Sequence, residues 1–170
     1  MSATKYIGTG AIQAADFKTV KWEGLTKGGN AVTITLKDAI NVGNIDWTFA
    51  EKNDVVPAIT FEACYDNTDA ASSSTIEPWD LEINGTPTAG ASEILLGAGK
   101  FYVNGSLIGL SRGGGQFTVE RENREINADG DRGMVKGRVV TESSRAKLTM
   151  NVLTMLTHVT DLYTGVEVSA

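Results

Sequence analysis

The sequence of 170 residues has little of the chemistry that most enzyme and metal sites require. It contains one cysteine, Cys64, and one histidine, His158, which excludes an internal disulfide and any metal site built from several Cys or His ligands. Basic residues are also scarce: 15 Lys and Arg stand against 21 Asp and Glu, and a net charge of −6 argues against a nucleic-acid-binding surface. The apolar runs are short, so we expect no membrane-spanning helix.

What the sequence does have favours β-structure. Thr, Val and Ile together account for 44 residues, and side chains branched at Cβ suit a pleated strand better than a helix. There are 19 Gly but only 3 Pro, a balance typical of tight hairpins and bulges. Apolar and polar residues alternate along several segments, and this period of two predicts half-buried strands at 20–25, 32–37, 45–49, 59–65, 79–83, 117–121, 135–141, 148–152 and 166–168. Residues 101–108 are predicted to be a hairpin, because Asn104-Gly105 supplies the two positive-φ positions of a type I′ turn.

One segment shows helical spacing instead. Apolar residues from Met155 to Tyr163 form a single face over two turns, with Thr154 as N-cap and Gly165 as the terminating glycine, so a short helix is predicted at about 154–164. About ten strands and one helix predict a mainly β fold, a two-sheet β-sandwich or flattened barrel. Between the strands, residues 66–78 and 84–99 are expected to be loops, and a long hairpin loop is expected at about 121–133.

The candidate chemical sites are weak. Asn127, Asp129 and Asp131 have the first spacings of a calcium loop, but Arg132 and Arg138 occupy positions where that loop needs Gly and Glu, so a solvated turn is favoured. His158 is interpreted as a surface or boundary residue and Cys64 as a quiet, half-buried thiol. We therefore expect no catalytic residues, no cofactor and no metal, and the protein is not expected to be an enzyme.

The order of three segments resembles the tail tube proteins of long-tailed phages. These segments are Gly99–Gly109, Gly113–Glu120 and Asp129–Gly137, and the predicted helix and the strand before it fit the same region of that family. Residues 31–65 are similar to the closing half of the family. The halves are in exchanged order: 1–83 resembles the C-terminal half, 84–99 a linker joining former termini, and 100–170 the N-terminal half. We interpret the chain as one domain in a circularly permuted order, which requires its two ends to lie close together.

The resemblance implies a structural function. Tail tube proteins assemble as rings, commonly hexameric, that stack into a hollow conduit for DNA, so the resemblance implies a homo-oligomer, tape-measure and terminator proteins as partners, and a virion assembled in the host cytoplasm. It also implies that the long hairpin contacts a neighbouring ring, through Arg121, Glu122, Asn123, Arg124, Glu125, Asn127, Asp129, Asp131 and Arg132.

An acidic wall would let DNA slide rather than bind, because negative charge repels phosphates. Glu120 and Glu122 share a strand face and are the candidate lumen residues, with a solvated outer face as the alternative. Other functions stay open: a tube subunit of a contractile injection system, or a virion decoration or carbohydrate-binding β-sandwich, for which Trp22, Trp47 and Trp79 are the candidate aromatic residues.

Overall fold

Ten strands and two short helical segments make up the structure, a computed structural model that describes residues 4–8, 10–43, 46–49, 51, 54–65, 77–86, 90, 93–130, 132–153, 159–162 and 165–169. In chain order the elements are β1 (Thr4–Gly8), the 3₁₀ turn η1 (Ala14–Asp16), β2 (Lys18–Thr26), β3 (Ala31–Asn41), β4 (Ala58–Ala63), β5 (Trp79–Ile83), β6 (Leu95–Val103), β7 (Ser106–Leu107), β8 (Ser111–Glu125), β9 (Val139–Val152), α2 (Val159–Leu162) and β10 (Gly165–Ser169). The prediction of a mainly β fold with one short α-helix is confirmed.

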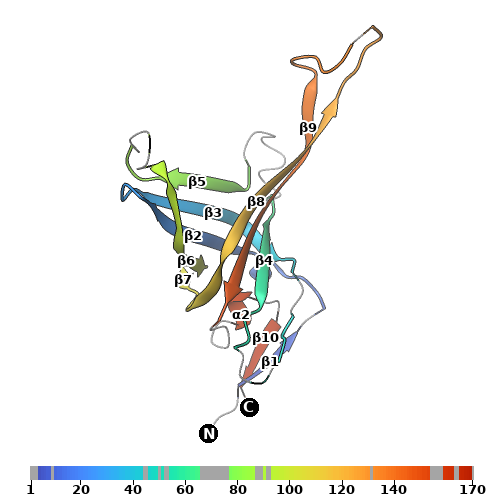
Figure 1. The fold of residues 1–170 in the computed structure, drawn as a ribbon. Coiled ribbons are helices and arrows are strands. Elements are labelled where there is room, and N and C mark those ends of the chain that lie inside the picture. The colour runs from blue at the N-terminus through green and yellow to red at the C-terminus, as the bar shows by residue number, and fades with distance from the viewer. Residues whose placement is uncertain are drawn as a thin grey trace.

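Eight of the strands form one antiparallel sheet, in the order β7-β6-β2-β3-β4-β9-β8. The eighth member of the sheet, β5, lies off this path because it shares one edge of β3 with β4. The first half of β3 pairs with β5, and the last three residues of β3 pair with β4. The two layers expected for a sandwich are thus opposite parts of one curved sheet, with β2, β3 and β6 on one side and β4, β8 and β9 on the other (Figure 1). The sheet does not close into a barrel.

The core lies on the concave face of this sheet and follows from the alternation in the sequence. Every second residue of β3, from Val32 to Leu36, is buried, and β4 and β9 alternate in the same way. Because successive strand side chains point to opposite faces, this spacing places one apolar set on the concave side. Its largest fully buried members are Phe61, Leu36, Ile59, Met150, Leu162, Val20, Val103 and Val152.

The short helix closes one end of this core. Leu162 in α2 is fully buried, and the ends of two strands hold the helix backbone: Asn41 Nδ2 donates to the Leu162 carbonyl at 2.8 Å and Lys18 Nζ to the Thr160 carbonyl at 3.0 Å. The described helix covers Val159–Leu162 of the predicted range, and residues 154–158, which include the predicted cap Thr154 and His158, lie outside the described residues. No helix in the described part of the chain is long and apolar enough to cross a membrane.

The turn between β6 and β7 confirms the sequence prediction. Asn104 and Gly105 have φ angles of 48° and 79°, the two left-handed conformations of a type I′ turn, and Val103 pairs with Ser106 across it. The Asn104 side chain also accepts a hydrogen bond from the Thr19 amide at 3.0 Å, which ties the turn to β2.

Four sequence predictions need correction. Residues 46–49 are not a strand, and the alternating Trp47 and Phe49 are exposed, with rings 6.2 Å apart. The expected linker at 84–99 ends early because Leu95–Gly99 belong to β6 and pair with β2. The strand expected at 135–141 begins at Val139. The hairpin loop expected at 121–133 is shifted, because residues 121–125 are still paired strand in β8.

The ends of the described chain pair with each other. β1 and β10 form a separate two-stranded antiparallel sheet in which Thr4 lies opposite Ser169 and Gly8 opposite Gly165. A circularly permuted order requires the two ends of the chain to lie close together, as they do here. The resemblance of residues 1–83 to the C-terminal half and of residues 100–170 to the N-terminal half of the family stays a prediction. The small sheet lies at the opposite end of the molecule from the tip of the β8–β9 hairpin (Figure 1).

Candidate functional site

The most conspicuous surface feature is the β8–β9 hairpin, whose outer part leaves the body of the protein (Figure 1). We call residues 122–143 the arm. Its two strands pair from Glu122 opposite Ser143 to Glu125 opposite Val139, with a bulge after Glu122. All described residues of the arm are exposed except Val135, Val139 and Ser143, which are half-buried. The arm therefore contributes no side chain to the core.

Polar contacts hold the arm straight at its base. Arg121 donates to a Glu77 carboxylate oxygen at 3.2 Å, and the Tyr65 hydroxyl donates to the other oxygen of Glu77 at 3.1 Å. Partial burial, together with this carboxylate, raises the pKa of Tyr65. Farther out, the strands are linked by an ion pair between Arg124 and Glu142 at 3.1 Å. These ion pairs lie largely at the surface and contribute little to stability. The arm continues the direction of β8 and β9, which are paired from the body of the protein as far as Glu125 and Val139.

The tip of the arm, residues 126–138, is the connection beyond the last strand pair. It is closed by a hydrogen bond from the Ile126 amide to the Arg138 carbonyl at 2.8 Å. The tip presents two large apolar side chains to solvent: Ile126 is 50% exposed and Met134 is 70% exposed. The two side chains are therefore available for contact with a second surface.

The structure distributes the predicted interface residues between two regions. Arg121, Glu122, Asn123, Arg124 and Glu125 lie in the paired strand β8, whereas Asn127, Asp129 and Arg132 lie in the tip. Asp131 lies outside the described residues. Sequence reasoning did not single out Ile126 and Met134. The available signal was that they are the largest apolar residues, with Val135, in an otherwise polar or small-residue stretch.

The candidate lumen residues Glu120 and Glu122 lie on the convex face of the sheet, opposite to the buried face. Phe117 and Val119, which pack on the core, alternate with them along β8. Glu120 accepts a hydrogen bond from Lys147 Nζ at 3.0 Å, and Glu122 accepts one from the Ser143 hydroxyl at 3.3 Å. Lys147 also lies 4.0 Å from Glu62 of β4, so a charge network crosses three neighbouring strands.

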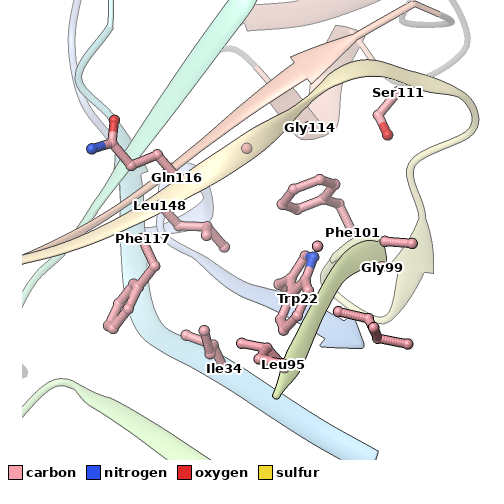
Figure 2. A pocket seen from close by; sticks show the side chains of 14 residues that line it. Trp22, Ile34, Leu95, Gly99, Phe101, Ser111, Gly114, Gln116, Phe117 and Leu148 are labelled. Carbon is pink, nitrogen blue, oxygen red and sulfur yellow. The ribbon is translucent and has the colours of Figure 1, made fainter. Parts of the chain in front are cut away.

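A second feature is an apolar groove of about 490 Å³ on the concave face between β6 and β8. The side chains of Trp22, Leu95, Phe101, Phe117 and Leu148 border the same space, as Figure 2 shows. None of the described residues that line the groove carries a charge; they are Trp22, Ile34, Leu95, Leu96, Gly97, Ala98, Gly99, Phe101, Ser111, Gly114, Gly115, Gln116, Phe117 and Leu148. The volume of the groove is within the range of about 300–1,000 Å³ that is typical of small-molecule binding pockets.

Glycines shape the floor of the groove. The Trp22 indole lies over Gly24 of its own strand and Gly99 of the neighbouring strand. A Cβ at either position would overlap the ring, so only glycine leaves room for the indole there. On the opposite wall, a Cβ at Gly115 would lie 2.6 Å from the Phe101 ring and 2.5 Å from the Thr149 carbonyl oxygen. Replacement of these glycines would therefore push aromatic side chains into the groove.

The groove is flanked by two unpaired strand edges. Apart from the two-residue strand β7, no described strand pairs with the outer edge of β6, and no described strand pairs with the outer edge of β8. Gly113 and Gly114 have φ angles of +89° and +76° and form a bulge that bends β8 before Gly115. β6 and β8 do not pair with each other in the described structure, so the sheet is open at this point.

Other candidate residues are dispersed. Trp22 is in the groove floor, Trp79 packs edge-on against Phe117 with ring centroids 5.4 Å apart, and Trp47 pairs with the exposed Phe49, so the three tryptophans do not form one surface. Within the described ranges, no group of three or more His, Cys, Asp or Glu is arranged to hold a metal ion.

Cys64 lies just after β4 and is partly buried. Burial raises the pKa of its thiol, and the negative charges of Glu62 and Asp38 raise that pKa further. Because the thiolate is the nucleophile, we expect alkylation by iodoacetamide at pH 8 to be slower in the folded protein than in urea. The rates should converge as the pH rises above the folded pKa, and equal rates at pH 8 would contradict this prediction.

Comparisons with known proteins leave the site to be interpreted from its own geometry. The chain matches no family model, and neither the curated proteins nor the solved structures contain a match.

Proposed function

We propose that the protein is a self-assembling structural subunit that forms tubes of the phage tail type through its arm. One observation carries the proposal: a paired ribbon projects from the body and presents Ile126 and Met134, 50% and 70% exposed, at its tip. A ribbon of two strands is at best marginally stable in water by itself, so contact with a second surface would stabilise the outer part of the arm. The resemblance of residues 99–137 to tail tube proteins supports the same function.

The sheet edges also favour self-association. β8 is a strand of 15 residues whose outer edge pairs with no other strand of the described ranges, and soluble proteins rarely leave so long an edge uncovered. The described hydrophobic core contains no residue of the arm, so the packing of the body does not depend on the arm. These features are expected of a subunit whose free surfaces are covered by copies of itself.

A tube of such subunits would conduct DNA without holding it. The net charge of −6 provides repulsion of phosphates, and Glu120 and Glu122 on the convex face are the proposed lumen residues. The pairing of Glu120 with Lys147 reduces its contribution, so Glu122 is the stronger candidate. The proposal places the protein in a virion tail that is assembled in the host cytoplasm, with tape-measure and terminator proteins as partners.

Assembly of the purified chain tests this function. We expect light scattering to report a concentration-dependent multimer, and negative-stain electron microscopy to show rings or tubes of uniform diameter. Because apolar contacts at the tip would contribute, assembly should persist at 0.5 M salt, where exposed ion pairs are screened over roughly 4 Å. A monomer at all concentrations, or aggregates without a repeating diameter, would rule the function out.

A further inference from the structure

We infer that the apolar groove between β6 and β8 binds an uncharged, ring-containing small molecule whose oxygen atom accepts a hydrogen bond from the Trp22 indole. The inference does not depend on the proposed function, because residues of a single copy of the chain form the groove. It joins two observations: a hollow of about 490 Å³ with aromatic walls, and a hydrogen-bond donor in its floor that has no acceptor among the described residues.

The walls of the groove suit a flat apolar ring. Trp22, Phe101 and Phe117 come from three different strands, β2, β6 and β8, and their side chains border one space (Figure 2). Aromatic rings held on separate strands offer a ligand ring both offset-stacked and edge-to-face contacts. The volume of the groove lies in the range of pockets that take small organic molecules, so a compound with two fused rings is of suitable size.

The hollow exists because glycines line much of it. Four of the fourteen described lining residues are glycines, namely Gly97, Gly99, Gly114 and Gly115. A Cβ at Gly97 or Gly114 would meet no atom within 4 Å, so open space lies beside both positions. A Cβ at Gly99 would overlap Nε1 of Trp22, so glycine at this position leaves the indole N–H uncovered. The groove therefore has room for a ligand directly beside this donor.

The indole N–H of Trp22 is the polar group that selects the ligand. Trp22 is only 9% exposed, and no described residue accepts a hydrogen bond from its Nε1 atom. The nitrogen lies beside Gly99, on the side of the indole that faces Phe101 (Figure 2). Buried tryptophan N–H groups usually have an acceptor, because an unpaired donor loses its hydration without compensation. A ligand oxygen in the groove would supply the missing acceptor.

The ligand has to be uncharged. No described residue that lines the groove carries a charge, so a charged group would lose its hydration without gaining a partner. The basic residues of β6 and of the first part of β8 have acidic neighbours: Arg112 pairs with Asp54 at 2.8 Å, and Lys100 lies opposite Glu23 of β2. The carbonyl oxygen of a ketone, ester or amide accepts a hydrogen bond without bringing a charge, so it is the acceptor that fits.

Fluorescence titration with a neutral probe tests the inference. The probe is prodan, an uncharged naphthalene ketone whose emission shifts to the blue in apolar surroundings. Its matched control compound has a methylene group in place of the carbonyl, and its binding is measured by displacement of prodan. Both compounds are titrated into the parent protein and into Trp22→Phe, which keeps an aromatic ring but has no N–H group. Trp47→Phe makes the same change at a tryptophan that does not line the groove.

We expect prodan to bind the parent protein and Trp47→Phe with blue-shifted emission. Trp22→Phe should lower the preference for the ketone over its control compound about fivefold, the effect of one hydrogen bond. A second variant, Gly97→Phe, adds a ring at a lining position where a Cβ has free space. Because this ring occupies the groove, it should weaken the binding of both compounds by about tenfold or more. Circular dichroism checks that each variant is folded.

Three results would overturn the inference. The first is the absence of a blue shift up to the solubility limit of prodan, or unchanged binding to Gly97→Phe, since the groove would then take no such ligand. The second is an unchanged preference for the ketone in Trp22→Phe, which would remove the assigned hydrogen bond. The third is tighter binding of the anionic probe anilinonaphthalene sulfonate than of prodan, which would contradict an uncharged ligand. None of these results bears on assembly through the arm, which is measured separately.

Discussion

A protein without its arm is expected to be a stable monomer that no longer assembles. Glu122 and Ser143 are directly paired, so residues 123–142 can be replaced by an Asn-Gly turn that rejoins the two strands at this position. The lost contacts are confined to the arm, including the exposed ion pair of Arg124 with Glu142. We expect the free energy of unfolding to change by less than about 1 kcal/mol, because exposed ion pairs contribute little.

Size-exclusion chromatography with light scattering would show the loss of assembly, and urea denaturation would show the retained stability. The full-length protein with Thr141→Ser, a change within the arm but away from its tip, provides the matched control. Tubes of normal length from the shortened chain would show that the arm has no part in assembly.

Gly99→Val is expected to cause the largest loss of stability. A Cβ at Gly99 would overlap the indole of Trp22 and would approach the Glu23 carbonyl oxygen to 2.7 Å, a backbone atom that cannot move aside easily. The indole would have to leave its position over the two glycines, with repacking of the Phe101 region. Overpacking of this kind in a sheet interior costs typically 1–3 kcal/mol and occasionally more, and we expect about 3 kcal/mol here.

Gly97→Val is the matched control for this prediction. Gly97 lies two residues earlier on β6 and also lines the groove, but a Cβ at Gly97 meets no atom within 4 Å. Because valine favours strands over glycine, this variant should be as stable as the parent protein or slightly more stable. Urea denaturation monitored by circular dichroism measures both variants, and an equal effect of the two would contradict the proposed role of Gly99 under Trp22.

The alternation of apolar residues was enough to predict most strands because a half-buried strand has a period of two in any context. The buried residues Val32, Ile34 and Leu36 show this, as does the Asn104-Gly105 turn, whose two positive φ angles follow from residue type. The same rule failed at residues 46–49. There Trp47 and Phe49 alternate, but no described strand pairs with this segment, and backbone pairing cannot be inferred from one segment alone.

The glycines also fall into two groups: those explained by their own turn, and those explained only by contacts with other strands. Gly105 is explained by its own turn, whereas Gly99 and Gly115 are explained only by Trp22 and Phe101, which lie on neighbouring or facing strands. The glycines of residues 84–99 suggested a loose linker. Gly99, however, belongs to strand β6, and it has to be glycine because the indole of Trp22 occupies the space that a Cβ would fill. The apolar tip residues Ile126 and Met134 had a local signal, but their exposure became visible only with the ribbon in place.

The sequence by itself determined the class of the protein: a mainly β chain with one short helix, a hairpin between residues 101 and 108, and a long polar excursion after residue 120. These features depend on local periodicity and on the conformational freedom of single residues. Only the tertiary structure decided that the sheet curls without closing, that a groove remains between β6 and β8, and that the arm leads away from it. Pairing, curvature and burial depend on contacts between residues far apart in the chain, so they cannot be read from any one segment.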